Sequence, residues 1–442
     1  MSDTLITGAR VVTPKGVMAA DVAIRNGKIV LGPKAVAGVA GVAGTEGAGG
    51  SRQTIDAGGK VLLPGFVDIH THGYEGFDFT LGLYDAATDS FDGSPERSLE
   101  ALGRYVTRMA ELGVTTTYLA TMAAETETLR RRLSLLETFL KSPPAGTRVL
   151  GAFLEGTFVN DKMVGAMNPD LVHRPDGALF DHINETGQVK LCLVTPEFDQ
   201  AALTLVRHLG RRGVVCGAGH TQATAEQIVA ARRAGLRYMV HFLNGPTGTS
   251  FKPFHGGGAV EGALADEKLY CELIADGYHV NPRYARDLIA RKGFERIIAV
   301  SDAMFAAGAR GLRTFQVNGV YGVVGPGGKY LQVAHSPQTL FGSCLNMPTA
   351  FGNLVSWLTA GGPGVWVMHH PGVGVDEALT AAALMTSGNP CRMMGLDKRL
   401  GIGSIATGRR ADLVLADLKG KPGDFRLEVH RTWIDGREVY AK

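Results

Sequence analysis

Six side chains that can bind a metal ion or carry a proton follow short apolar runs in this sequence. Four are histidines, one is a glutamate and one is an aspartate: His70, His72, Glu155, His220, His241 and Asp302. The runs before them have the composition of buried strands. Imidazole nitrogen and carboxylate oxygen are ligands that zinc and other divalent metals accept. The set is therefore the one that a two-metal hydrolytic site requires.

The spacing of the first two histidines adds to this interpretation. Residues i and i+2 of a strand point to the same face, so His70 and His72 present two imidazoles side by side. Taken singly, each of the six residues is more often structural than functional, and an H-x-H pair alone is a weak signal. Together they favour a metal site, because a TIM barrel gathers the carboxyl ends of its strands at one face.

The elements that must position these residues lie between about residues 60 and 400. Helical patterns cover 95–112 and 226–234. Short apolar runs predict strands at 61–63, 149–153, 191–194, 213–216, 238–240 and 297–300. Repeated strand-then-helix order predicts parallel strands with crossover helices, and several such units favour a (β/α)₈ TIM-type barrel of the α/β class. We assign residues 63–399 to this metal-dependent catalytic barrel.

Both ends of the chain predict β structure. Residues 4–12 and 20–29 alternate apolar and polar side chains, with Asn26-Gly27 as a hairpin turn, and Asp435-Gly436 is a second hairpin signal near the other end. Because chain termini commonly lie close together, we expect residues 1–62 and 400–442 to form one small β-sandwich domain. The stretch 35–51, rich in Gly and Ala, predicts a flexible loop.

Composition and charge exclude several classes of protein. The 442 residues carry 45 basic and 42 acidic side chains, and a net charge of +3 indicates neither a nucleic-acid nor a membrane partner. No apolar run is long enough to span a bilayer, and the first residues do not resemble a signal peptide. The 5 scattered cysteines indicate no disulfide framework. We expect a cytoplasmic protein that acts on a small molecule.

With these motifs the sequence resembles the amidohydrolase superfamily. The marks are Pro64-Gly65-Phe66-Val67-Asp68 before the H-x-H pair, the later single histidines and Asp302. Within the superfamily it resembles the N-acetylglucosamine-6-phosphate deacetylase family along nearly the whole chain. The motifs that carry this second resemblance are Leu154-Glu155-Gly156, Gly219-His220-Thr221, His241-x-x-Asn244-Gly245, residues 274–280, residues 301–308, Gly342-Ser343-x-Leu345 and residues 403–414.

The resemblance implies a homodimeric hydrolase that removes the N-acetyl group from an amino sugar with one or two divalent ions. Zinc is expected, and iron or manganese also suits these ligands. By the resemblance, Glu155, His220 and His241 hold the main ion, and His70 and His72 hold a second one with Glu155 between the two. Asp302 acts as general base, with a role as metal ligand as the alternative. By the same resemblance, His279 is a catalytic residue that polarises or contacts the acyl group and the sugar, with a merely structural role as the alternative. Asn244, Gly245 and Leu345 contact the substrate.

Two positions depart from the family's pattern where it recognises the sugar phosphate. Met167 stands where the family has the histidine of Gly-Ala-His, and a thioether cannot donate a hydrogen bond to an anion. No arginine follows His241 where the family has one. Lys252 and His255 are the nearest substitutes, as point charges, although a solvated loop residue is the other interpretation of Lys252. We expect intact deacylation and altered phosphate recognition.

Two other functions stay open at this point. One is a different amidohydrolase, acting on an N-acyl amino acid or a cyclic amide, and many of those bridge their metals with a modified lysine where Glu155 stands here. The other is a non-catalytic metal- or sugar-binding homologue. The presence of all six residues argues against it, because the fold alone would not require them. The long Gly-rich segments 80–97 and 308–337 are predicted either to cover the site or to be insertions without fixed structure.

Overall fold

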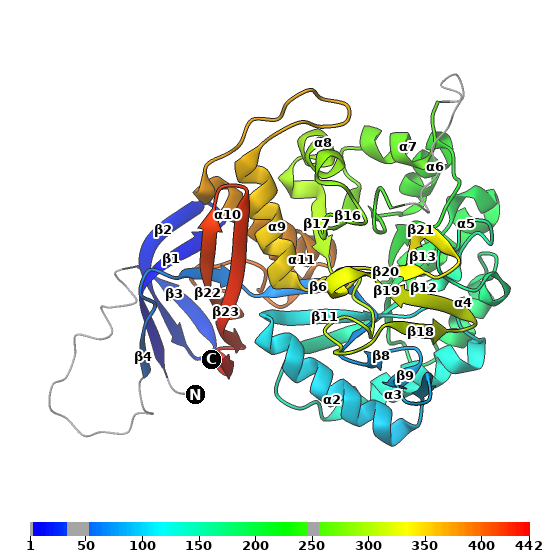
Figure 1. The fold of residues 1–442 in the computed structure, drawn as a ribbon, viewed down its shortest axis with the longest axis horizontal. Helices are drawn as coiled ribbons and strands as arrows, with labels where there is room; N and C mark the ends of the chain where they lie inside the picture. Colours follow the sequence, from blue (N-terminus) through cyan, green and yellow to red (C-terminus); the bar gives the residue numbers. More distant parts are fainter. Residues whose placement is uncertain (1–2, 33–52, 245–255) are drawn as a thin grey trace, which may run out of the picture.

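The computed structural model describes residues 3–32, 53–244 and 256–442. The loop predicted at 35–51 and the predicted substrate residues Gly245, Lys252 and His255 lie outside these ranges. Two bodies are visible in Figure 1: a sheet built from both chain ends, and a barrel of strands and helices. No helix within the described ranges is both long enough and apolar enough to cross a membrane.

Eight parallel strands form the barrel that the sequence predicts. In chain order they are β6 (Phe66–Thr71), β11 (Val114–Ala120), β12 (Arg148–Phe158), β13 (Val189–Val194), β14 (Val215–Ala218), β15 (Tyr238–Met239), β16 (Tyr270–Ile274) and β17 (Ile297–Val300). Each pairs with its neighbour in the chain, and β17 returns to lie against β6, where the Asp302 amide donates to the His70 carbonyl at 2.9 Å. Every residue of β6, β11 and β17 is buried, as parallel strands covered on both faces require.

Helices follow most of these strands and cover the barrel. They are α2 (Pro95–Glu111), α3 (Thr126–Lys141), α4 (Gly177–Ile183), α5 (Asp199–Arg211), α6 (Ala225–Ala234), α7 (Ala259–Ala265), α8 (Pro282–Lys292), α9 (Met347–Ala360), α10 (Val375–Ala383), α11 (Asn389–Met393) and α12 (Leu396–Arg399). Both predicted helices are confirmed as α2 and α6. A capping box of Thr224 and Gln227 starts α6, and Gly235, with a φ of 131°, ends it.

The β segments of the two chain ends come together, as predicted, and they pair in one continuous sheet. Its strands are β1 (Thr4–Thr13), β2 (Gly16–Arg25), β3 (Lys28–Leu31), β4 (Gln53–Asp56), β5 (Val61–Pro64), β22 (Leu413–Lys421), β23 (Asp424–Ile434) and β24 (Arg437–Ala441). The order is β24-β23-β22-β5-β1-β2-β3, with β4 beside β1, so β5 and β22 join the N-terminal half to the C-terminal half. Figure 1 shows the blue and red strands side by side. The sheet has a hydrophobic core of its own, which includes Ile6, Val22 and Trp433.

Three strand predictions need correction. The run at 61–63 is β5 of the terminal sheet rather than a barrel strand, since it pairs with β1 and β22. Strands β11 and β16 were not predicted as strands. Thr115, Thr116 and Thr117 interrupt the apolar run of β11, and Glu272 interrupts that of β16, yet all four residues are buried. A barrel interior accepts such residues where their polar atoms find partners.

Two small antiparallel sheets include strands from the segments 80–97 and 308–337, which were predicted as a lid or as insertions without fixed structure. The first has β7 (Gly73–Tyr74), β8 (Phe77–Asp78), β9 (Gly82–Asp85) and β10 (Ser90–Asp92). The second has β18 (Thr314–Val317), β19 (Val320–Val324), β20 (Leu331–Val333) and β21 (Ser336–Leu340), drawn yellow in Figure 1. Phe305, Phe315 and Phe341 pack edge to face between them, so both segments share a small core. Turn glycines, rather than disorder, account for their composition.

Candidate active site

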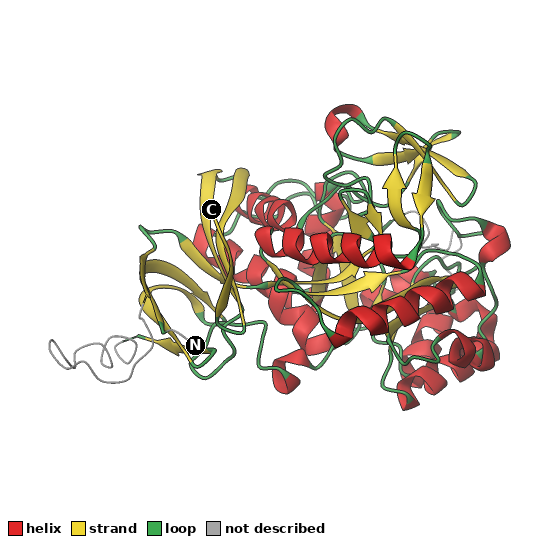
Figure 2. Ribbon diagram, turned by 90° about the horizontal axis from the view of Figure 1, so that it is seen from below, coloured by secondary structure: helices red, strands yellow, loops and turns green. Residues whose placement is uncertain are grey.

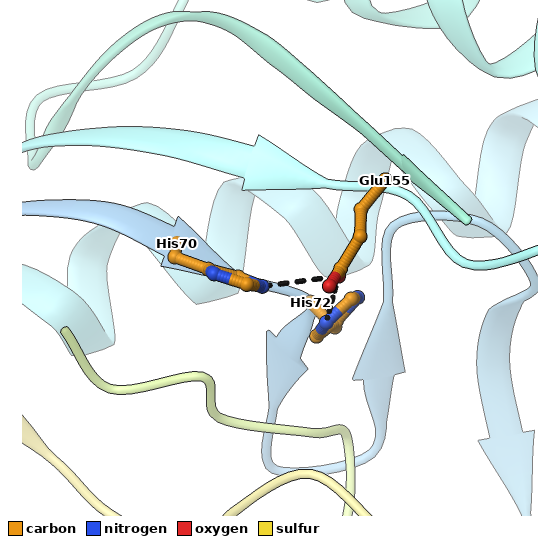
Figure 3. A group of neighbouring side chains, drawn as sticks. All are labelled: His70, His72 and Glu155. Carbon is orange, nitrogen blue, oxygen red and sulfur yellow. Dashed lines mark hydrogen bonds and ion pairs between the residues drawn. The ribbon is translucent and has the colours of Figure 1, made fainter. Parts of the chain in front are cut away.

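Glu155 lies at the centre of the histidine cluster. Its Oε2 atom is 3.0 Å from His70 Nε2 and 3.2 Å from His72 Nε2. Its other oxygen, Oε1, is 3.1 Å from His241 Nε2 and 3.5 Å from His220 Nε2. Figure 3 shows the carboxylate between the imidazoles of His70 and His72. Each oxygen therefore faces its own pair of histidines.

The strand ends of the barrel bring these residues together. Glu155 is within β12, His70 is within β6, and His72 follows directly; His220 and His241 follow β14 and β15. His220, His241 and Asp302 have positive φ angles of 47°, 28° and 49°, which non-glycine residues rarely adopt. Such backbone persists where the surrounding structure holds it, and it is concentrated at functional sites. The chain turns sharply at each of these three strand ends and directs the side chain into the barrel mouth.

The cluster suits two divalent ions that share Glu155. Two groups, His70–His72–Glu155 and Glu155–His220–His241, have ligand atoms that lie within 4.8 Å of one another. Asp302 Oδ1 is 3.1 Å from His72 Nε2 and 3.3 Å from His70 Nε2, so it borders the first group. All six side chains are buried. Because carboxylates so deeply buried need positive charge nearby, the donor set fits cations.

Hydrogen bonds at the far side of two rings prepare their Nε2 atoms for metal binding. His70 Nδ1 donates to Glu272 Oε2 at 3.0 Å, and His220 Nδ1 donates to the carbonyl oxygen of Met163 at 2.7 Å. A ring that carries its proton on Nδ1 has a lone pair on Nε2, the atom that faces Glu155. The tautomer that the hydrogen bonds favour is therefore the one that binds a metal.

Charges within the cluster strongly perturb its pKa values. Burial lowers the pKa of His70, but the charges of Glu155, Glu272 and Asp302 outweigh burial and hold this pKa well above its usual value. Burial likewise disfavours the charged form of His72, yet hydrogen bonds to Asp302 and Glu155 raise its pKa to about 9. Without metal, protons thus occupy His70 and His72 at neutral pH.

The carboxylates respond in the opposite direction. Burial raises the pKa of Glu155, but His70, His220 and His241 outweigh it and hold the pKa well below its usual value. Burial also raises the pKa of Asp302, whereas His70 and His72 lower it to below its ordinary range. Both groups are therefore ionised at neutral pH, which is the form that binds a cation or accepts a proton.

These pKa values predict that metal binding depends on pH. A divalent ion binds neutral imidazole, so it must displace the proton that His72 retains up to about pH 9. We expect the apparent affinity of the metal-free protein for Zn²⁺ to rise about a hundredfold per pH unit from neutral pH towards about 9, because His70 and His72 each release one proton when an ion binds to this group. Isothermal titration calorimetry in buffers of different ionisation enthalpy measures the protons released. An affinity that stays constant with pH would contradict the prediction.

A cavity of about 460 Å³ opens over the cluster. Its lining includes Glu155, His72, His220, His241 and Asp302, together with the predicted substrate residues Met167, Asn244 and His279. Its volume is within the range of small-molecule sites. The structure therefore brings all the predicted metal residues except His70, and three predicted substrate residues, to the lining of one cavity.

His279 is held in a fixed orientation at this cavity. Its Nδ1 donates to Asp276 Oδ2 at 2.7 Å, and Asp276 Oδ1 accepts from the backbone amides of Tyr278 and His279. The ring nitrogen left for a ligand is Nε2. Leu345, by contrast, is buried in the hydrophobic core and does not line the cavity.

Sequence reasoning missed several residues of this site. Glu272 has no sequence signal, because it lies in the middle of β16, which the sequence did not predict as a strand. Lys162 also lines the cavity, as do Asn318, Gln338 and Thr339, which come from the β18–β21 sheet. The sheet could have been expected from its alternating apolar residues at 314–324, but its position over the barrel mouth could not.

Comparison with known proteins agrees with this geometry. A sequence model of a protein family, described as "Amidohydrolase family", matches residues 61–439 of this chain. An N-acetylgalactosamine-6-phosphate deacetylase of Escherichia coli O157:H7 is 31% identical over 391 residues, which are 86% of this chain and 87% of that protein. An N-acetylglucosamine-6-phosphate deacetylase of Vibrio furnissii is 30% identical over 385 residues, which are 86% of this chain and 83% of that protein.

Solved structures extend the similarity to the whole fold. The N-acetyl-D-glucosamine-6-phosphate deacetylase of Mycobacterium smegmatis, in complex with N-acetyl-D-glucosamine-6-phosphate, superposes with a TM-score of 0.75 at 26% identity and covers 99% of this chain and 100% of its own. The Pasteurella multocida deacetylase, at 20% identity, has a TM-score of 0.79 over 100% of both chains and bears on the fold alone. The family resemblance and the barrel prediction are confirmed: this chain belongs to the amidohydrolase family and is a hydrolase of carbon–nitrogen bonds.

Proposed function

We propose that this protein removes the acetyl group from an N-acetyl amino sugar. The observation that carries the proposal is the Glu155 carboxylate, shared between two pairs of histidines at the floor of a cavity of about 460 Å³. The relatives at 31% and 30% identity are named as deacetylases of N-acetylgalactosamine 6-phosphate and N-acetylglucosamine 6-phosphate. Because the two names differ in the sugar, the proposal covers both epimers.

We propose that one or two divalent ions serve as cofactor, with zinc expected and iron or manganese compatible with the same donors. His220 and His241 would hold one ion and His70 and His72 the other, with Glu155 shared. A divalent ion in such a site polarises the amide carbonyl and lowers the pKa of water. Amide carbonyls are poor electrophiles, which is why the reaction needs this assistance.

Asp302 is the general base in this proposal. It is ionised at neutral pH, and it borders both the cavity and the His70–His72 group. It takes a proton from the attacking water and then gives a proton to the nitrogen of the departing amine, so that the carbon–nitrogen bond breaks and acetate and the free amino sugar leave. A role as metal ligand is the alternative, and the two are separated by the metal content of an Asp302 variant.

The substrate contacts in this proposal are His279, Asn244 and Met167. With Nδ1 donating to Asp276, a neutral His279 offers the lone pair of Nε2 to a sugar hydroxyl, whereas the protonated ring offers Nε2–H to the acyl oxygen. Asn244 offers an amide at the same cavity. Gly245, Lys252 and His255 remain predicted contacts outside the described residues. Leu345, which does not line the cavity, is not one of the proposed contacts.

We further propose that recognition of the 6-phosphate is altered. Met167 lines the cavity where a histidine was expected, and its thioether offers no donor. Lys162, on the same loop, is a cation that lines the cavity. The proposed substrate is an N-acetyl amino sugar that is unphosphorylated or carries another substituent.

A panel of sugars tests both parts of this proposal. N-Acetylglucosamine, N-acetylgalactosamine and their 6-phosphates are incubated with the metal-loaded protein, and the free amino sugar is measured. Release of amino sugar from none of the four would contradict the proposed function. A preference of several hundredfold for the phosphorylated sugars would leave the deacetylase function standing and overturn altered phosphate recognition.

Restoring a histidine at position 167 makes a separate prediction. Met167→His is expected to raise kcat/KM for the 6-phosphate substrates by about 10-fold to 100-fold, because a hydrogen bond to a charged group contributes about 1.5–3 kcal/mol. Turnover of the unphosphorylated sugars is the internal control and is expected to change little. A variant that gains nothing with the phosphorylated sugars would show that Met167 does not lie near that group.

We also propose that the protein acts in the cytoplasm as a homodimer, as the family resemblance implies. The five cysteines are free and four of them are buried, which agrees with a reducing compartment. Light scattering after size-exclusion chromatography measures the oligomeric state.

A further inference from the structure

Glu272 is a buried carboxylate that connects the two halves of the histidine cluster. It lies in β16, and its side chain has no exposed surface. Its Oε2 atom accepts from His70 Nδ1 at 3.0 Å and from the backbone amide of His241 at 2.9 Å. One oxygen is therefore bound to a member of each metal-binding group.

The surroundings of Glu272 argue against a merely structural role. Within the described part of the chain, its carboxylate forms an ion pair with His70 alone. Its second oxygen, Oε1, and the hydroxyl of Tyr238 are both buried without a hydrogen-bond partner in the described part of the chain. An ionised carboxylate in such a place is costly unless a positive charge nearby compensates it. A glutamine or an apolar residue would complete this core at lower cost.

The position of Glu272 suggests what its charge contributes. Glu272 accepts a hydrogen bond from Nδ1–H, and this bond holds the His70 ring with Nε2 towards Glu155. A carboxylate acceptor also makes Nε2 more basic, and therefore a stronger metal ligand. The bond to the His241 amide holds the backbone where φ is 28°. The first contact acts through charge and the second through geometry alone.

We propose that Glu272 is a positioning residue that sets the affinity of the His70–His72 group for its ion. This inference rests on the proposed metal-dependent function and adds to it a residue that contacts neither the ion nor the substrate. The charge of Glu272 acts on His70, whereas the His220–His241 group receives from it only a backbone hydrogen bond. Loss of the charge should therefore weaken one ion and spare the other.

The experiment replaces the charge and keeps the shape. Glu272→Gln retains an oxygen that can accept a hydrogen bond but removes the negative charge. The metal-free protein is titrated with Zn²⁺ by calorimetry, and bound metal is counted by elemental analysis after gel filtration. We expect one ion to bind about 10-fold to 100-fold more weakly and the other to change by less than a few-fold. The absorption spectrum of Co²⁺-loaded protein should show the loss of one site.

A matched control is available elsewhere in the chain. Asp287 is also a buried carboxylate that accepts from a histidine, His370 Nε2 at 2.6 Å, and from the backbone amides of Val365 and Trp366. Asp287→Asn should leave both metal affinities unchanged. Glu272→Asp, which keeps the charge but shortens the side chain, should fall between wild type and Glu272→Gln, and it serves as the test if Glu272→Gln does not fold.

The weaker ion is assigned to its group by a double-mutant cycle. In a background where His72→Asn has already disabled the first group, adding Glu272→Gln should cost no further zinc affinity. A full additional loss in that background would overturn the assignment to His70.

Other outcomes would also overturn the inference, and they point to different failures. A folded Glu272→Gln variant that binds both ions as wild type does would contradict the role of the charge. Equal weakening of both ions, together with a lower melting temperature, would indicate a structural role. Wild-type protein that binds a single ion would leave His70 without an ion to hold, and wild-type protein that binds none would overturn the proposed function itself.

Discussion

Replacing Asp302 with asparagine is expected to lower kcat by about 10²-fold to 10⁴-fold while the protein keeps its metal, because this range is what a positioned general base contributes. Asparagine fills the same space but cannot accept the proton of the attacking water. Glu155, His220 and His241 remain in this variant, so elemental analysis should find the metal of that group unchanged.

The same variant separates the two roles of Asp302. If the ion of the His70–His72 group is lost together with activity, Asp302 serves as a ligand of that ion, which its distances of 3.1 and 3.3 Å from the Nε2 atoms permit. A variant that retains wild-type turnover would remove Asp302 from the mechanism altogether. The pH dependence of kcat is a further readout, since the acidic limb that reports ionisation of the base should disappear with it.

Replacing Glu155 with glutamine should have an effect on both ions at once. Each oxygen of Glu155 faces one pair of histidines, so a neutral amide removes the charge that the two groups share. We expect the variant to retain neither ion after gel filtration and to lose activity by about 10³-fold, since a Lewis-acid ion contributes several kcal/mol to the transition state and about 1.4 kcal/mol corresponds to tenfold.

The metal-free form of this variant offers a second measurement. Glu155 is one of the two carboxylates that raise the pKa of His72 to about 9, so His72 should titrate at lower pH in Glu155→Gln, as monitored by NMR of its ring protons. Glu127→Gln, at an exposed position, is the control. Retention of one ion at full occupancy would show that the two groups do not depend on a common ligand.

The sequence predicted the arrangement of this molecule through local chemistry. Asn26-Gly27 and Asp435-Gly436 have positive φ angles and join β2 to β3 and β23 to β24, as their residue types indicate. The six metal and proton-transfer candidates converge because each follows, or stands near the end of, a parallel strand. A rule about strand ends is enough for that prediction.

The features that escaped prediction depend on contacts between distant segments. Glu272 is identified only by its partners, which lie in β6 and after β15, and its own neighbours in the sequence are those of an ordinary strand. Similarly, the run 61–63 has the composition of a barrel strand, and only its pairing with β1 and β22 assigns it to the other sheet. Composition carries no information about which partner a strand will find.

The position of β22 between β5 and β23 has a consequence for synthesis of this protein on the ribosome. Strand β5 is made early, whereas its neighbour β22 begins at Leu413 and emerges only after the whole barrel has been translated. Until then one side of β5 presents unpaired amide and carbonyl groups, the kind of edge on which nascent chains associate. We expect ribosome-bound chains that end before Leu413 to bind chaperones more strongly than full-length chains that have been released from the ribosome.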